Sequence, residues 1–363
     1  MNAGPTRILV VDDSALYRQS IHNVLREVAD VSIVGTAKNG VEALAKIKEL
    51  DPDLLTLDVQ MPDMNGIEVL QEIRRRRLRP KAIMVSSFTS EGAQVTTDAL
   101  MEGAFDFILK PSGNDCVANR QQLRDALTEK ITAFRQAANS RKLAGRRAIS
   151  HRIVASDDVV ESAPTPNAAC RAVVVATSTG GPRALKVVLP RLPAGLPVPV
   201  FVVQHMPAQY TSSLAMRLNE ICHLDVLEAK NRTEVVAGKV FVAPGGRQMK
   251  LERDGPRLMI QVNEDPAENG VRPSADYLLR STAEVLKGDV LAVIMTGMGR
   301  DGLAGCQMLK QVGGYVFAQS QDDCVVYGMP KAVIDGGLAD RTIPLGKIAP
   351  AIVRHVKRSR RRP

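Results

Sequence analysis

The sequence predicts an α/β protein with two doubly wound domains in one chain. The chain has 363 residues, which exceeds the usual size of a single domain. In two separate regions, short apolar runs alternate with longer amphipathic runs, as in parallel sheets whose strands are connected by helices. A stretch without sustained periodicity separates the two regions. We therefore expect each region to bury its own core.

The first region extends from Arg7 to about Ala138 and reads as strands alternating with helical segments. Its first apolar run, ILVV, is followed by an amphipathic segment from Ala15 to Val28. Further apolar runs follow at similar spacing, and we predict a parallel sheet with strands at Ile8 to Val11, Val31 to Thr36, Leu54 to Leu57, Ala82 to Val85 and Phe105 to Ile108.

The second region, from Cys170 to about Val356, restarts the alternation with the runs AVVVA, PVFVV and LAVIM. The stretch between the regions, Ser140 to Ala169, contains arginines and the segment APTPNAA, a composition typical of a linker. A helix that begins near Asn119 is expected to lead into it. The expected parts are a first domain at 1–125, a helical extension and linker at 126–169, a second domain at 170–357 and a basic tail at 358–363.

The composition indicates an ordinary globular protein of the cytoplasm. Hydrophobic residues make up 45% and charged residues 24% of the chain, as in typical globular domains. The N-terminus lacks the pattern of a signal peptide, and no apolar run is long enough to span a membrane. The cysteines show no CxxC spacing, so neither a disulfide framework nor a zinc site is predicted. We expect a monomer without membrane insertion.

A net charge of +9 raises the question of nucleic-acid binding. The basic clusters at Arg74 to Arg77, Arg141 to Arg147 and Arg358 to Arg362 fall on a predicted helix end, a linker and a tail. Aromatic residues make up only 3% of the chain, which is too few for base stacking. The sequence therefore predicts no nucleic-acid partner.

Three acidic residues follow two strands of the first predicted sheet. Asp12 and Asp13 come directly after the first strand, and Asp58 follows the third in LLTLDVQMPDMNG. Because the carboxyl ends of neighbouring parallel strands meet at one crevice, these carboxylates are expected to lie together. Mg²⁺ prefers such a set of carboxylates together with phosphoryl oxygens. Asp58 is then the candidate nucleophile toward a phosphoryl group, although acidic loop residues are often only solvated.

Two further side chains fit the same site. Lys110, in LKP after the fifth strand, can neutralise phosphoryl charge. The following Pro111 suits a cis peptide bond. Ser86 ends the fourth strand and supplies a hydroxyl donor.

Taken together, these residues resemble the receiver domain of bacterial response regulators over residues 6–125. The resemblance rests on VDDS at Val11, DVQMPDMNG at Asp58, SS at Ser86 and KP at Lys110. It implies a flavodoxin-like fold with a five-stranded parallel sheet. It also implies that Mg²⁺ is held by Asp12, Asp13 and Asp58 and that Asp58 is phosphorylated. Ser86 and Phe107 would occupy the two switch positions, and Lys110 would bind the phosphoryl group.

In the second region, the first strand leads into TSTGGPRAL. A strand, a serine, two glycines and a helix that begins near Pro182 place Ser178 at a tight turn with helical N–H groups nearby. This position suits a nucleophile beside an oxyanion site. A helix N-cap or a glycine-rich phosphate loop has the same local pattern, so the turn alone does not decide.

His205 and Asp301 also stand at predicted strand ends. His205 follows PVFVV in QHMP, and Asp301 follows LAVIM in TGMGRDG. A Ser-His-Asp triad requires these three groups in one crevice. The chain order Ser, His, Asp differs from the order Ser, Asp, His of α/β-hydrolases, which argues against that fold.

These residues resemble the catalytic domain of CheB, the chemotaxis family of protein-glutamate methylesterases and glutaminases, over about 170–337. The shared motifs are ATSTGGP, VVQHMP, VAPGG, RPSADYLLRS, TGMGRDG and VVYGMP. The resemblance implies the triad Ser178, His205 and Asp301, with Thr179 and Met298 as possible support for the oxyanion site. Gln248 departs from the family pattern, because relatives often have His there.

The resemblance also implies what the chain acts on and what controls it. The substrates would be methyl-accepting chemotaxis receptors, and a CheA-type histidine kinase would supply the phosphoryl group. Mg²⁺ would serve phosphorylation, and ester hydrolysis would need no cofactor. Two alternatives remain: an output domain that binds a ligand through TSTGG without turnover, and a DNA-binding output, for which the strand-rich second region offers no helix-turn-helix.

Overall fold

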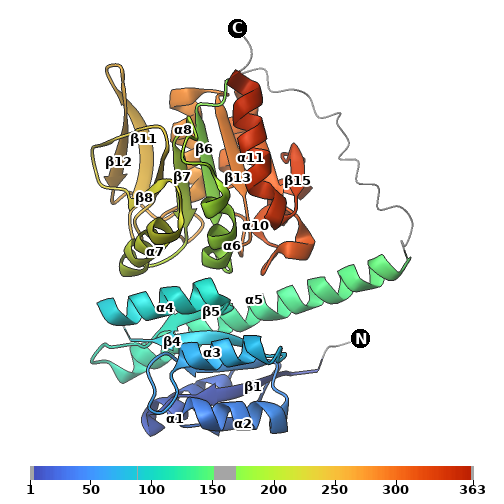
Figure 1. Cartoon of the computed structure of the whole chain (residues 1–363). Coiled ribbons are helices and arrows are strands. Elements are labelled where there is room, and N and C mark those ends of the chain that lie inside the picture. Colours follow the sequence, from blue (N-terminus) through green and yellow to red (C-terminus); the bar gives the residue numbers. More distant parts are fainter. Residues whose placement is uncertain (1–3, 88, 151–168, 361–363) are drawn as a thin grey trace. The chain divides into compact units, whose positions relative to one another are not determined.

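The computed structural model describes residues 4–87, 89–150 and 169–360 of the chain (Figure 1). The chain divides into two compact units, Met1–Ala138 and Asn139–Pro363, and each has its own parallel sheet. In the described ranges, no helix combines the length and the apolar character needed to cross a membrane.

The first unit is built on a five-stranded sheet in the order β2-β1-β3-β4-β5, with all neighbours parallel. The order reverses between β1 and β3, which creates a crevice at their carboxyl ends. The predicted strands are thereby confirmed. The elements are β1 (Thr6–Val11), α1 (Ala15–Leu25), β2 (Val31–Ala37), α2 (Gly40–Leu50), β3 (Leu54–Asp58), α3 (Gly66–Arg75), β4 (Lys81–Ser86), α4 (Ser90–Glu102), β5 (Asp106–Leu109) and α5 (Cys116–Ser150).

Local signals in the sequence set where these helices begin. The side chains of Ser14 and Asn39 cap α1 and α2 by accepting a backbone N–H of the first turn. Asn65 and Glu68 form a reciprocal capping box at α3. Asp115 accepts the N–H groups of two following residues at 2.8 and 3.1 Å, so α5 begins before the predicted position. The helix continues to Ser150, into the segment assigned to the linker, and residues 151–168 lie outside the described ranges.

The second unit contains a seven-stranded parallel sheet in the order β15-β14-β13-β6-β7-β10-β8 and a small antiparallel sheet in the order β11-β12-β9. The elements are β6 (Ala172–Thr177), α6 (Gly181–Val188), η1 (Leu189–Arg191), β7 (Val200–Gln204), α7 (Ala208–Ile221), β8 (Asp225–Glu228), β9 (Thr233–Glu234), β10 (Lys239–Val242), β11 (Gln248–Asp254), β12 (Arg257–Asn263), α8 (Ala275–Leu286), β13 (Val290–Ile294), α9 (Leu303–Gln311), β14 (Tyr315–Gln319), η2 (Gln321–Asp323), α10 (Met329–Asp335), β15 (Arg341–Ile343) and α11 (Leu345–Arg360).

The order in which the chain adds strands to the large sheet reverses at β6. From β6 the chain moves to β7, β8 and β10 on one side, and it then returns to β13, β14 and β15 on the other. Crevices at such a reversal, outside the carboxyl ends of the strands, are the usual ligand sites of open α/β sheets. This predicted doubly wound architecture is confirmed.

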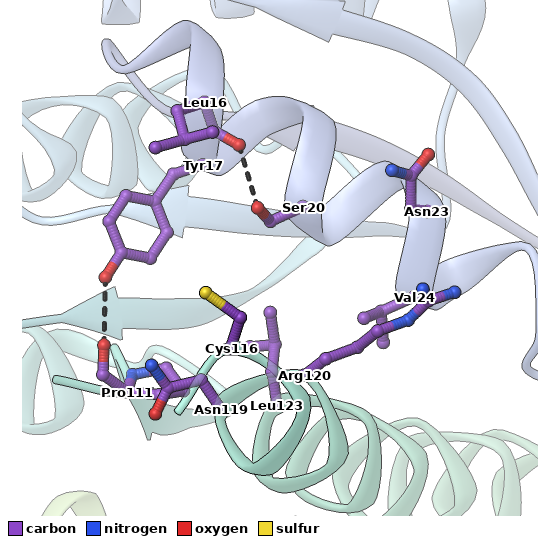
Figure 2. A pocket seen from close by; sticks show the side chains of 10 residues that line it. All are labelled: Leu16, Tyr17, Ser20, Asn23, Val24, Pro111, Cys116, Asn119, Arg120 and Leu123. Carbon is purple, nitrogen blue, oxygen red and sulfur yellow. Dashed lines mark hydrogen bonds between the residues drawn. The ribbon is translucent and has the colours of Figure 1, made fainter. Parts of the chain in front are cut away.

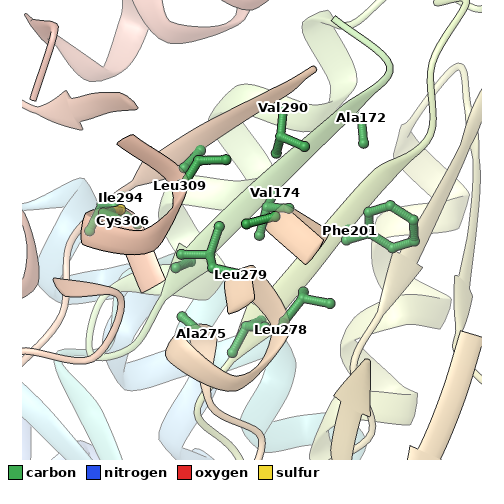
Figure 3. Packing of buried hydrophobic residues seen from close by; sticks show 14 of the residues in the cluster. Ala172, Val174, Phe201, Ala275, Leu278, Leu279, Val290, Ile294, Cys306 and Leu309 are labelled. Atoms are coloured by element: carbon green, nitrogen blue, oxygen red, sulfur yellow. The ribbon is translucent and has the colours of Figure 1, made fainter. Parts of the chain in front are cut away.

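Apolar side chains bury both faces of this sheet. On one face, alternate residues of β6 such as Ala172 and Val174 pack with Leu278 and Leu279 of α8 (Figure 3). The residue between the first two, Val173, is also fully buried and points to the opposite face, because successive side chains of a strand alternate. On that opposite face α6 contacts both α7 and α11 (Figure 1). Helices on both faces therefore hold the strand ends in fixed positions.

Candidate active site and phosphoryl site

Ser178 lies at the turn between β6 and α6. Its N–H donates to the carbonyl of Thr296 at 3.0 Å, and its own carbonyl accepts from Gly181 N at 2.7 Å, so the turn is tight. A Cβ on Gly180, which has a φ of +78°, would lie 2.5 Å from Val325 Cβ, and one on Gly181 would lie 1.9 Å from Gln204 Oε1. Only glycines fit at these two positions. The TSTGG motif thus places the serine at the carboxyl edge of the sheet.

His205 lies beside this turn at the end of the neighbouring strand β7. Residues 177 and 204 are register partners in β6 and β7, so Ser178 and His205 occupy equivalent positions one residue further along. Backbone pairing continues there, because His205 N donates to Thr177 O at 3.2 Å. The imidazole Nε2 lies 2.8 Å from Asp301 Oδ2. The structure therefore brings together the three residues that the sequence pointed to.

The Asp301 carboxylate sits at the N-terminus of α8. Its Oδ2 accepts the N–H of Ala275 at 2.7 Å, and its Oδ1 accepts the N–H of Asp276 at 3.1 Å and the hydroxyl of Ser274 at 2.7 Å. Helix N-termini favour negative charge at this position. Burial raises the pKa of Asp301, but the hydrogen bonds from His205, Ala275 and Ser274 outweigh it and hold the pKa below its usual value. Asp301 is therefore held as a carboxylate in contact with the imidazole.

The loop after β13 approaches the serine closely at Gly297. A Cβ at this glycine would lie 2.8 Å from Ser178 Cβ and 3.1 Å from Ser178 N. Met298, the candidate for oxyanion support, follows it in the same loop and is half-buried. Thr179 is buried, and its carbonyl accepts the Thr296 hydroxyl at 3.0 Å. One side of the serine turn is thus closed by the loop after β13.

A second polar site lies in the first unit at the carboxyl ends of β1 and β3. Asp12, Asp13 and Asp58 each offer a carboxylate oxygen, and these oxygens lie within 4.8 Å of one another. Lys110 Nζ lies 2.8 Å from Asp12 Oδ2 and 2.9 Å from Asp58 Oδ2. Burial raises the pKa of Asp58 to about 6, the Lys110 hydrogen bond opposes this shift, and the charges of Asp12 and Asp13 add to it. One lysine therefore leaves an excess of negative charge, which suits a divalent cation.

The Lys110 side chain packs against Tyr17 of α1. The Lys110 ammonium lies over the Tyr17 ring, 4.5 Å from its centroid, and the Tyr17 hydroxyl donates to the carbonyl of Pro111 at 3.1 Å (Figure 2). Burial lowers the pKa of Lys110, but its hydrogen bonds to Asp12 and Asp58 outweigh burial and raise it. Contrary to the expectation from the sequence, the Lys110–Pro111 bond is not cis. The trans form of an X–Pro bond is favoured by about 0.5–1 kcal/mol. In the described residues, the cis bond lies at Arg272–Pro273.

Ser86 and Phe107, the two switch candidates, lie on the neighbouring strands β4 and β5. Ser86 is fully buried, and its hydroxyl donates to Gly92 O at 3.3 Å. Phe107 is half-buried and pairs in register with Met84 of β4. Lys110 N donates to the Ser86 carbonyl at 2.7 Å. A backbone hydrogen bond thus links Ser86, which carries the strand-end hydroxyl, to Lys110.

The two parts of the chain that carry these sites match two known families of domains. Residues 173–352 match the family model described as CheB methylesterase, and residues 8–141 match that of the response regulator receiver domain. Curated proteins named protein-glutamate methylesterase/protein-glutamine glutaminase are similar over nearly the whole chain. One from Desulfotalea psychrophila is 42% identical and covers 97% of this chain and 98% of its own, and one from Bacillus licheniformis is 42% identical with 98% and 99% covered.

The chain belongs to the CheB family. The resemblance seen in the sequence is thereby confirmed. The crystal structure of the Thermotoga maritima CheB methylesterase catalytic domain is 42% identical, covers 51% of this chain and 97% of its own, and superposes with a TM-score of 0.50.

Gln204 belongs to this CheB-type site, and the sequence analysis missed it. The buried amide of Gln204 donates to Ser178 O at 3.0 Å and to His205 O at 3.3 Å, and it accepts the Thr177 hydroxyl at 2.7 Å. It links the segments that carry Ser178 and His205. The available signal was a single polar residue at the end of the apolar strand PVFVV.

The departure from the CheB pattern at Gln248 has a structural explanation. Its side chain is fully buried, donates to Pro266 O at 2.9 Å and accepts Ser274 N at 2.9 Å. It therefore holds the N-terminus of α8, where Asp301 is bound. In this chain Gln248 supports the site from within the protein.

Proposed function

We propose that this CheB-type enzyme hydrolyses glutamyl methyl esters, and the side-chain amides of particular glutamines, on methyl-accepting chemotaxis receptors. The observation that carries the proposal is the His205 Nε2 contact to Asp301 Oδ2 at 2.8 Å, beside Ser178 at the reversal of the sheet. The names of the relatives, protein-glutamate methylesterase/protein-glutamine glutaminase, support the choice of substrate class.

The proposed chemistry is acyl transfer through Ser178. With Nε2 bound to Asp301, the other ring nitrogen of His205 is left to accept the serine proton. The serine oxygen attacks the side-chain carbonyl carbon and forms a tetrahedral intermediate. His205 then protonates the leaving group, so that methanol leaves from an ester and ammonia from an amide. Water, deprotonated by the same histidine, hydrolyses the acyl-enzyme to free glutamate and serine.

We further propose that phosphorylation of Asp58 controls this activity. A bound Mg²⁺ would be held by Asp12, Asp13 and Asp58, and it would offset the charge of the incoming phosphoryl group. Lys110 would pair with a phosphoryl oxygen, and Ser86 and Phe107 would respond to it. The proposed phosphodonor is a CheA-type histidine kinase. A 100-fold activation needs only about 2.8 kcal/mol of differential stabilisation.

Methanol release from a methylated chemoreceptor tests the proposed reaction. Wild type, S178A and D58N are compared with and without a small phosphodonor and Mg²⁺. We expect release by wild type, a rise with the phosphodonor, no rise in D58N and a loss of about 10⁴-fold or more in S178A. Release by S178A at the wild-type rate would contradict the assigned nucleophile.

Two modes of control are open to the first domain: it can block the esterase site until phosphorylated, or it can add a stimulating contact when phosphorylated. We propose domain limits of 1–125 and 170–357, joined by 126–169 and followed by the tail 358–363. A fragment 170–363 separates the two modes, since relief of a block predicts a fragment more active than the unphosphorylated chain. A less active fragment would favour the stimulating contact.

A further inference from the structure

The acid of the candidate triad has a carboxylate neighbour. Asp276, on the first turn of α8, is buried, and its Oδ1 accepts Gly305 N at 2.7 Å. Burial raises the pKa of Asp276, the Gly305 hydrogen bond opposes the shift, and the charge of Asp301 adds to it. Two buried carboxylates close to one another repel, so a shared donor stabilises both.

Asn269 supplies that donor. Its Nδ2 lies 2.9 Å from Asp276 Oδ2 and 3.4 Å from Asp301 Oδ1. The second distance is long for a strong hydrogen bond, but the amide presents a positive dipole end to both acids. The Asp301 oxygen that faces Asn269 is Oδ1, whereas Oδ2 faces His205. Asn269 thus acts on the side of the carboxylate opposite the imidazole.

The backbone around Asn269 fixes this side chain. Glu268 and Val271 exchange hydrogen bonds at 3.1 and 2.9 Å, and the residues between them have φ of 53° and 77°. These values and the Asn-Gly sequence are those of a two-residue hairpin turn. The Glu268 carboxylate also accepts Arg280 Nη1 of α8 at 2.8 Å. The turn is therefore attached to the same helix that binds Asp301.

We propose that Asn269 is a positioning residue for the catalytic site: its amide, held by the turn 268–271, joins Asp301 to Asp276 and fixes the Asp301 carboxylate toward His205. The inference rests on the proposed function, because it assigns Asn269 a role in that triad. Asn269 makes no covalent or proton-transfer step. It orients the acid that orients the base.

Two substitutions separate positioning from turn formation. Asn269→Gly keeps a residue that readily adopts positive φ but removes the amide. Asn269→Asp also suits the turn, but it replaces the donor with a third carboxylate. Asn263→Ala is the matched control, because that amide donates to Tyr277 Oη of α8 at 2.8 Å and does not contact either buried acid in the described structure.

The expected result is a loss in kcat with little change in KM. For N269G in the full chain with phosphodonor, we expect kcat for methanol release to fall at least about 10-fold, since misplacement of catalytic groups costs this much or more. For N269D, the added negative charge stabilises the imidazolium, so the acid limb of the rate profile should move to higher pH. N263A should retain the wild-type profile. A wild-type kcat in N269G, together with an unshifted acid limb in N269D, would overturn the inference.

A second measurement is independent of the substrate. With ¹⁵N-labelled histidine, the ring nitrogen signals of His205 are recorded by NMR in wild type, N269G and N263A, and assigned by comparison with H205Q. We expect these signals to move in N269G only, because the Asp301 carboxylate that contacts the ring loses its amide partner. If wild type released no methanol but N269G still moved the signals, the proposed function would fail and the inference would stand. Unchanged ring signals in an active enzyme would overturn the inference alone.

Discussion

The Gln204 amide donates to the carbonyl oxygen of Ser178 at 3.0 Å and to that of His205 at 3.3 Å. One buried side chain therefore links the backbone of the candidate nucleophile to that of the candidate base. Its other end accepts the Thr177 hydroxyl at 2.7 Å, so the amide cannot rotate without losing partners.

Replacing Gln204 by Glu should reduce activity and stability together. The carboxylate cannot donate to the two carbonyls, which leaves buried acceptors without a partner at a cost of about 1–3 kcal/mol. We expect kcat to fall about 10-fold or more, since the relative position of Ser178 and His205 is disturbed. Methanol release and thermal unfolding measure both effects. Gln261→Glu, on the half-buried strand β12, is the control, and a similar loss there would contradict a specific role for Gln204.

The buried carboxylate of Asp58 should make the first domain more stable at low pH than at high pH. Its pKa is raised from 3.8 to about 6 by burial, so the folded state binds a proton more readily than the unfolded state. This stabilisation is present at low pH and is lost as the pH rises through about 6. D58N should therefore raise the unfolding temperature more at pH 8 than at pH 5, measured by calorimetry with EDTA. An equal gain at both values would contradict the expectation.

Tyr17 should help to hold Lys110 for phosphorylation. Its ring lies under the ammonium, and it forms one wall of a cavity of about 350 Å³ between α1 and α5 (Figure 2). Removing the ring in Tyr17→Leu should slow phosphorylation of Asp58 by a small phosphodonor about 3- to 10-fold, the range of a cation–π contact. Tyr17→Phe keeps the ring and should stay near wild type. Equal rates in both variants would argue against the ring contact.

His355 should contribute to acid unfolding of the second domain. It is buried on α11 against Tyr315 and Phe317, and burial lowers its pKa to about 4. The unfolded chain binds a proton near pH 6.5 while the folded chain does not, so stability falls as the pH drops from about 6.5 toward 4. His355→Phe should weaken this dependence in denaturant unfolding series at several pH values. An unchanged slope of unfolding free energy against pH would contradict this contribution of His355.

The sheets and the strand ends could be predicted from the sequence, but the supporting contacts could not. Apolar runs identify strands because burial on both faces requires them, and polar residues just after them, such as Ser178 and His205, then fall at one edge. Gln204 and Asn269 were missed because their roles depend on backbone atoms brought together by the fold. The start of α5 was misplaced because the cap by Asp115 was not recognised.

The large sheet assembles its reactive edge from segments far apart along the chain. His205 and Asp301 are separated by 96 positions, and Asp301 follows β13, which must insert beside β6 before the acid reaches the imidazole. A ribosome-bound chain that lacks this strand carries the serine and the histidine without their orienting acid. On the proposed mechanism, hydrolysis would therefore begin during synthesis only after β13 has emerged and paired with β6.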